Sequence, residues 1–124
     1  MIDRRKRPIH IALIDDDSSV RKAVSRLLRS HDFACTTYDS AESALSDPAL
    51  SSAQCLVIDV HLSGMNGFAL RDRLRQAGVD IPSLFITANA DSGSPDWLRS
   101  IGDTPWLQKP FDETQLLSAI ERLL

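Results

Sequence analysis

No stretch of the 124-residue sequence approaches the roughly 20 consecutive apolar residues of a membrane-spanning helix. The basic first seven residues precede no apolar segment of signal-peptide length. Cysteine is scarce: Cys35 and Cys55 lack the paired spacing of a zinc site or a CxxC redox motif, which favours buried free thiols. These absences predict a cytoplasmic protein with no membrane segment, zinc site or disulfide.

The composition fits one globular domain, because 43% of the residues are hydrophobic and 25% are charged. It excludes a chain that is disordered, collagen-like or of low complexity throughout. Residues 1–7 hold four basic and one acidic side chain, so the other 117 residues carry a net charge of −6. This acidic body argues against a broad nucleic-acid-binding surface. Residues 1–7 are predicted to be a basic disordered tail, with contact to an anionic partner as the alternative.

Short apolar runs alternate with segments of helical period along the chain. Strands are predicted over 9–14, 33–38, 55–60, 82–87 and 106–108, and helices from 18 onward and over 40–45, 67–77, 95–101 and 112–124. Asp17 or Ser18 caps the first helix in this prediction, whereas Asp39 with Glu42 and Asp112 with Gln115 form capping boxes, and Gly78 ends the third helix. Nearly continuous apolar strands indicate a parallel sheet covered on both faces, a doubly wound α/β fold with five strands and five helices.

Polar side chains stand at the carboxyl ends of these strands, where such folds place their active crevice. They are Asp15, Asp16 and Asp17 after the first strand, Asp59, Thr87, and Lys109. Two carboxylates about 4 Å apart repel by roughly 4 kcal/mol at an effective dielectric constant near 20, so the cluster would recruit a cation, and hard oxygen ligands suit Mg²⁺. A carboxylate there can attack phosphorus, while lysine and threonine bind phosphoryl oxygens.

Each residue also has a purely structural interpretation. Asp16 and Asp17 favour a helix N-terminus, Thr87 suits a strand, and Lys109 before a proline suits a surface turn. Their conjunction at four strand ends is what indicates a site.

The sequence resembles the receiver domain of two-component response regulators over residues 8–124. The resemblance rests on four motifs: Ile14-Asp15-Asp16-Asp17, Val57-Ile58-Asp59-Val60, Phe85-Ile86-Thr87-Ala88 and Gln108-Lys109-Pro110-Phe111. The resemblance is strongest to receiver domains that are attached to helix-turn-helix output domains of the nitrogen-fixation regulator type. It implies a flavodoxin-like sheet of strand order 2-1-3-4-5, with five helices on both faces.

The resemblance also implies a set of residue roles. Asp59 would accept a phosphoryl group from a histidine kinase, and Lys109 would contact that group. Asp15, Asp16, Asp59 and the backbone carbonyl of His61 would hold Mg²⁺. Such a domain would catalyse its own phosphorylation and dephosphorylation, and the bond before Pro110 would be cis.

The implied switch consists of Thr87 and Trp106. Their movement would change a surface formed by the fourth helix, the fifth strand and the fifth helix, which the family often uses for dimerisation. His61 and Asn89 occupy positions that tune the lifetime of the acyl phosphate in the family. An effector domain or partner protein outside this chain would read the change, and the domain itself shows no nucleic-acid motif.

The sequence departs from the family pattern at several positions. Leu62-Ser63 replaces Met-Pro, Trp106 replaces a smaller aromatic ring, and residues 102–105 replace a Gly-Ala pair. Residues 92–95 predict a fourth helix that is short, shifted or mobile.

Two other functions stay open at the level of sequence. A pseudo-receiver would keep the fold as an interaction module without phosphorylation. A haloacid-dehalogenase-type phosphatase would use Asp15 as nucleophile in an Asp15-x-Asp17-x-Ser19 motif, although it leaves Asp59 without a role and needs a longer chain. The identity of the phosphorylated aspartate separates these functions.

Overall fold

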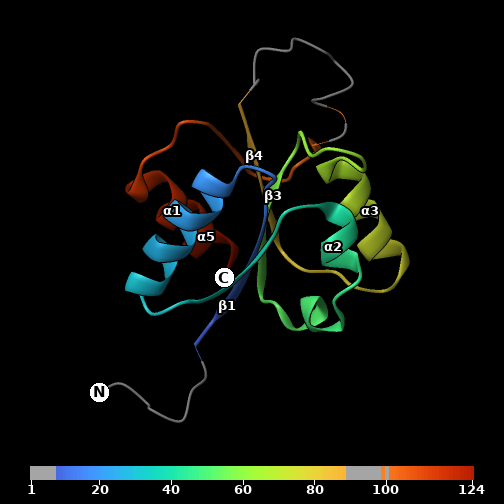
Figure 1. The fold of residues 1–124 in the computed structure, drawn as a ribbon, viewed down its shortest axis with the longest axis horizontal. Helices are drawn as coiled ribbons and strands as arrows, with labels where there is room; N and C mark the ends of the chain where they lie inside the picture. The colour runs from blue at the N-terminus through green and yellow to red at the C-terminus, as the bar shows by residue number, and fades with distance from the viewer. Residues whose placement is uncertain (1–7, 89–98, 100) are drawn as a thin grey trace.

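Five parallel strands form one sheet between two helical layers in the computed structural model, which describes residues 8–88, 99 and 101–124 (Figure 1). In chain order the elements are β1 (His10–Ile14), α1 (Ser18–Ser30), β2 (Ala34–Tyr38), α2 (Ala41–Leu45), the 3₁₀ helix η1 (Pro48–Ser52), β3 (Cys55–Asp59), α3 (Gly67–Gln76), β4 (Ser83–Thr87), β5 (Trp106–Gln108) and α5 (Glu113–Leu123). The strand order β2-β1-β3-β4-β5 confirms the predicted doubly wound α/β fold.

Some predictions fall outside the described residues. These are the tail over 1–7, nearly all of the helix over 95–101, the segment 92–95 and Asn89. Among the described residues, no helix has both the length and the apolar character required to cross a bilayer.

Alternate residues of each strand point to opposite faces of the sheet, and each face has its own core. Ile14, Ile58 and Phe85 belong to a cluster that packs under α2 and α3. Leu13 and Ile86 belong to a second cluster, which packs under α1 and α5. Figure 1 shows these two pairs of helices on opposite sides of the strands. The sheet is therefore buried on both faces, as its apolar strands predict.

The helix ends follow the sequence with one exception. The Asp17 side chain caps α1, Asp112 and Gln115 form a capping box at α5, and Gly78 follows α3 with φ +82°. The capping box predicted for Asp39 and Glu42 is wrong by one residue, because Ser40 and Ser43 form it instead. Ser40 is the N-cap of α2, because its extended backbone brings its hydroxyl to the Ser43 N–H.

The segment between α2 and β3 contains an element that the pattern did not predict. Asp47 caps the 3₁₀ helix η1, and Pro48 stands in its first turn. Pro48 suits that place because its missing N–H would have no partner there. The apolar spacing gave no sign of η1, since a single turn buries only Leu50.

Candidate functional site

The strand register brings two aspartates together at one edge of the sheet. Ile14 of β1 pairs with Ile58 of β3, so Asp15 and Asp59, the next residues, lie side by side. Both are almost fully buried, at 0% and 4% exposed. Asp16, which is exposed, adds a third carboxylate, and one oxygen of each of the three lies within 4.8 Å of the others. Three acids this close form a strongly negative pocket.

Lys109 supplies the counter-charge. Its Nζ lies 2.7 Å from Asp15 Oδ2 and 3.2 Å from Asp59 Oδ2. Burial would lower the pKa of Lys109, but its contacts with Asp15 and Asp59 outweigh that effect and raise the pKa. Burial raises the pKa of Asp15, and the charge of Asp59 adds to this, against the opposing contacts with Lys109 and the Asp17 N–H. One ammonium is thus shared by two carboxylates.

Thr87 ends β4 beside this pocket. Asp59 pairs with Ile86 in the sheet, which places Thr87 one residue beyond Asp59 on the neighbouring strand. Thr87 is fully buried, and its carbonyl accepts the Lys109 N–H at 2.8 Å. The Lys109–Pro110 peptide bond is cis, as the resemblance implies.

Backbone groups orient the carboxylates. The Asp17 N–H donates to Asp15 Oδ1 at 2.9 Å, and the His61 N–H donates to Asp59 Oδ1 at 3.0 Å. Arg21 of α1 donates from its guanidinium to the Asp15 carbonyl at 2.8 Å. The two N–H bonds hold the carboxylates at fixed angles before any ligand arrives, whereas Arg21 holds the backbone of Asp15.

Two further residues complete the pocket, and sequence reasoning did not assign them to it. Ser63 Oγ donates to Asp16 Oδ2 at 3.2 Å, so the loop that lacks the family's proline is tied to the acidic pocket. A Cβ at Gly67 would lie 2.5 Å from the Asp59 carbonyl oxygen, so only glycine allows α3 to begin this close to Asp59. One indication of the role of Ser63 was present in the sequence, because Ser63 stands where the family often has proline. Nothing in the sequence indicated the close approach of Gly67 to Asp59.

Not all of the predicted site residues therefore lie together in the acidic pocket. Asp15, Asp16, Asp59 and Lys109 come together, with Thr87 beside them. Asp17 instead accepts the Ser19 N–H and caps α1. His61 reaches the pocket through its N–H, and Trp106, 39% exposed, lies on β5 opposite Phe85.

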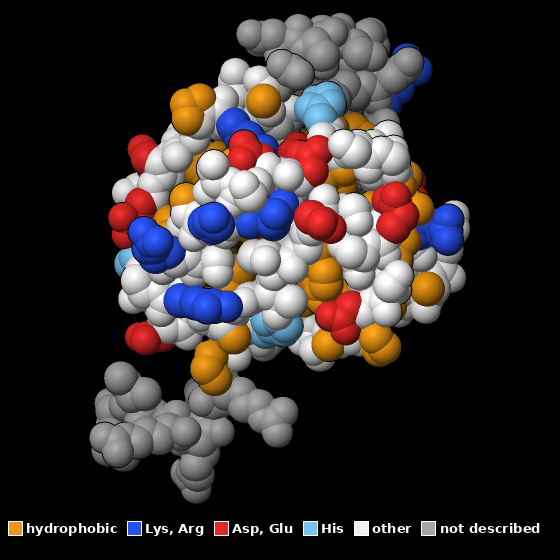
Figure 2. Space-filling view, viewed as in Figure 1, with side chains coloured by type: hydrophobic (Ala, Val, Ile, Leu, Met, Phe, Trp, Pro, Cys, Tyr) orange, Lys and Arg blue, Asp and Glu red, His pale blue; other side chains and the backbone are white. Residues whose placement is uncertain are grey.

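The surface beside the pocket has the opposite charge. Lys and Arg gather on the side of the molecule that carries α1 (Figure 2), a helix with Arg21, Lys22, Arg26 and Arg29 and no acidic residue. A basic surface of this kind raises the local concentration of anions. The pocket can hold a hard cation in its carboxylates, while Lys109 and this surface favour an anionic group next to it.

The comparisons with known proteins agree with this geometry. The response regulator receiver domain family matches residues 11–121. The response regulator protein TodT of Pseudomonas putida strain F1 is 33% identical over 114 residues, covering 92% of this chain and 50% of TodT. The DNA-binding transcriptional regulator NtrC of Salmonella typhimurium is 30% identical over 112 residues, covering 90% of this chain and 24% of NtrC.

Solved structures give the same result. The response regulator StyR superposes with a TM-score of 0.82 at 37% identity, over 96% of this chain and 60% of StyR. The chemotaxis protein CheY4 of Vibrio cholerae superposes with a TM-score of 0.83 at 25% identity, over 94% of this chain and 99% of CheY4.

A five-stranded parallel sheet with an acidic pocket at its carboxyl edge defines a phosphorylation-responsive switch of the two-component class. The chain belongs to the response regulator receiver domain family. It spans about half the length of TodT and about a quarter of NtrC.

Proposed function

We propose that Asp59 is the phosphoacceptor of this receiver domain. One carboxylate oxygen of Asp59 attacks phosphorus, the new P–O bond forms, and the bond from phosphorus to the donor's histidine nitrogen breaks, leaving the nitrogen its electron pair. The position of Asp59 carries this proposal: it is buried, held by the His61 N–H, and faces Lys109 at 3.2 Å. Asp15 has the same two kinds of partner, the Asp17 N–H and Lys109, but its contact with Lys109 is shorter, at 2.7 Å, which makes Asp15 the less available nucleophile.

The residues of the pocket fit Mg²⁺, because three carboxylates offer hard oxygen ligands within 4.8 Å. Asp15, Asp16, Asp59 and the His61 carbonyl would hold it. The ion would supply charge neutralisation between the carboxylates and the incoming phosphoryl group. Lys109 then shifts from Asp59 to a phosphoryl oxygen, and Ser63 keeps Asp16 oriented.

Thr87 and Trp106 form the switch in this proposal. A phosphoryl group adds about −1.5 to −2 charges and three strong acceptors, which gives the Thr87 hydroxyl a partner that exists only in the phosphorylated state. Such a differential contact shifts a two-state equilibrium. β5 and α5, with the segment before β5, would carry the change to a second copy, an effector domain or another partner, and a histidine kinase in the cytoplasm would supply the phosphoryl group.

Intact mass tests the proposal. The wild-type chain is incubated with Mg²⁺ and acetyl phosphate beside Asp59→Asn and Asp17→Asn, the latter as a matched control outside the carboxylate cluster. We expect one phosphoryl addition in the wild type and in Asp17→Asn, and none in Asp59→Asn. Addition on Asp15 would favour the phosphatase interpretation. No addition to a folded wild-type chain would favour the pseudo-receiver.

A further inference from the structure

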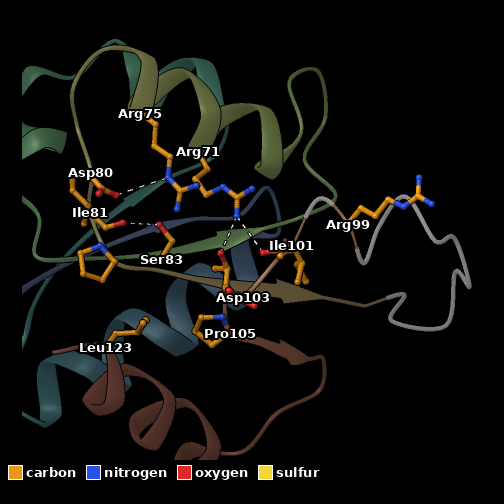
Figure 3. A pocket seen from close by; sticks show the side chains of 13 residues that line it. Arg71, Arg75, Asp80, Ile81, Ser83, Arg99, Ile101, Asp103, Pro105 and Leu123 are labelled. Atoms are coloured by element: carbon orange, nitrogen blue, oxygen red, sulfur yellow. Dashed lines mark hydrogen bonds and ion pairs between the residues drawn. The ribbon is translucent and has the colours of Figure 1, made fainter.

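Arg71 is a cation of α3 that faces the protein interior rather than solvent. Only 9% of the residue is exposed. Its Nη1 donates to Thr104 Oγ1 at 2.9 Å and lies 3.5 Å from the Ile101 carbonyl oxygen (Figure 3). The acceptors belong to the connection between residue 101 and β5, so Arg71 joins α3 to that connection.

The guanidinium also packs on β4. Arg71 Cζ lies 5.0 Å from the centroid of the Phe85 ring, and Phe68 meets that ring edge-on at 4.9 Å. Phe85 pairs with Trp106 in the sheet, and its N–H donates to the Pro105 carbonyl at 3.0 Å. Arg71 thus spans three elements: α3, the middle of β4 and the entrance to β5.

Two contacts of Arg71 are with neutral acceptors, and a third is with an aromatic ring. Asp72 Oδ1 lies 3.7 Å from Arg71 Nε, but this carboxylate is exposed, so solvent weakens the attraction. Arg75, one turn further along α3, pairs at 3.8 Å with Asp80 and is exposed. Thr104 and Phe85 therefore hold Arg71 through neutral partners.

A hollow lies beside this contact. A cavity of about 450 Å³ opens between the second half of α3, the start of β4 and the connection into β5, with Asp80, Ser83 and Asp103 on its wall (Figure 3). Because protein interiors are close-packed, a segment that borders an open hollow has more room to change position than one within the core.

We propose that the contact between Arg71 and Thr104 is a latch that holds the connection into β5 in its resting arrangement, and that phosphorylation must open it. This inference rests on the proposed function. Thr87 lies two residues beyond Phe85 on β4, and Lys109 lies three residues beyond Trp106 of β5. A phosphoryl group that draws both Thr87 and Lys109 pulls on the two strands that Arg71 ties to α3, so the latch opposes the pull. Arg71 is a positioning residue in this scheme.

Thr104→Val is the sharpest test, because valine keeps the shape of threonine and removes the acceptor. The phosphoryl analogue beryllofluoride, in the presence of Mg²⁺, is titrated into the full chain and followed by tryptophan fluorescence. We expect half-saturation at about fivefold lower concentration in Thr104→Val than in the wild type, within the usual range of such couplings. Urea unfolding of the same samples measures the accompanying loss of stability.

Two more variants separate a latch from a simple structural anchor. Arg71→Lys keeps a donor for Thr104, so its half-saturation lies closer to the wild-type value than that of Thr104→Val. Arg75→Gln removes an exposed neighbour and leaves beryllofluoride binding unchanged. Loss of stability in Thr104→Val with unchanged or weaker beryllofluoride binding overturns the latch alone. A wild-type chain that neither binds beryllofluoride nor gains a phosphoryl group overturns the proposed function, and the latch with it.

Discussion

Lys109 and Arg71 are both largely buried cations, and the structure surrounds them in opposite ways. Lys109 lies between the carboxylates of Asp15 and Asp59. Arg71 lies against a hydroxyl, a carbonyl and the ring of Phe85. Removing Lys109 leaves two anions facing each other, whereas removing Arg71 takes a donor away from two neutral acceptors. We therefore expect the first cation to matter most for chemistry and metal binding, and the second for the position of a segment.

Lys109→Met has the largest expected effect. We expect its initial rate of phosphorylation by acetyl phosphate to fall about 100-fold, which is typical when a group that stabilises transition-state charge is removed. Arg71→Lys stays within about tenfold of the wild type, since couplings between distant sites are of that size. Time courses of intact mass with Mg²⁺ give both rates. A Lys109→Met rate near that of the wild type would contradict the assignment of Lys109 to the phosphoryl group.

The effect of Mg²⁺ on stability gives a second test of the difference between Lys109 and Arg71. At the proposed Mg²⁺ site, Lys109 of the wild type would compete with the ion for Asp15 and Asp59. In Lys109→Met that competition is gone, and a ligand that binds only the folded state stabilises it more as its affinity rises. We expect MgCl₂ to raise the urea midpoint of Lys109→Met by more than it raises the midpoint of the wild type. The increase for Arg71→Met should equal the increase for the wild type. Equal shifts in all three proteins would show that Lys109 does not compete with the ion.

The effect of losing Arg71 on stability is smaller. We expect Arg71→Met to lower the free energy of unfolding by about 2 kcal/mol, because Thr104 Oγ1 and the Ile101 carbonyl lose a charged donor in a buried place. Arg75→Met, at an exposed position, changes it by less than about 0.5 kcal/mol. Urea denaturation of both variants measures the difference. If both variants lost the same free energy of unfolding, the buried contacts of Arg71 would contribute no more to stability than the exposed ion pair of Arg75.

The two cations also differ in how far the sequence predicted them. Lys109 follows an apolar strand, so the rule that such folds place their site at the carboxyl ends of strands predicted that it meets Asp59. Arg71 is one of three arginines at alternate positions of α3, and no sequence motif singled it out. The spacing of Arg71 indicates that it lies on the buried face of α3, because it comes four residues after Gly67 and three before Leu74, which are both buried. Spacing assigns a face of a helix, but only the fold gives the distance to Thr104.

The same limit explains the other residues that were missed. The capping box of α2, the bond from Ser63 to Asp16 and the contact of Gly67 with the Asp59 carbonyl each depend on a local backbone path. Periodicity locates strands and helices to within a residue or two, and it says nothing about loops. The site formed by the carboxylates, Thr87 and Lys109 was predictable because four strand ends converge on it.

The Tyr38 hydroxyl, on the β2 side of the sheet, is a buried neutral group whose ionisation affects stability only at alkaline pH. The Tyr38 hydroxyl donates to Asp47 Oδ2 at 2.7 Å. Burial, followed by the bond and the charge of Asp47, raises the pKa of Tyr38 to about 12, and Tyr38 is the only tyrosine in the chain. Ultraviolet absorbance therefore reports its ionisation without overlap from another tyrosine.

The sign of the pH dependence follows from this shift. The pKa of Tyr38 rises from 10.0 in the unfolded chain to about 12 in the folded one, so its contribution to stability is complete below pH 10 and is lost as the pH rises towards 12. Tyr38→Phe should remove this alkaline dependence of the urea midpoint. Asp47→Asn should bring the pKa of Tyr38 part of the way back to 10, because burial remains. An unchanged pKa in Asp47→Asn would assign the whole shift to burial and leave the carboxylate no part in it.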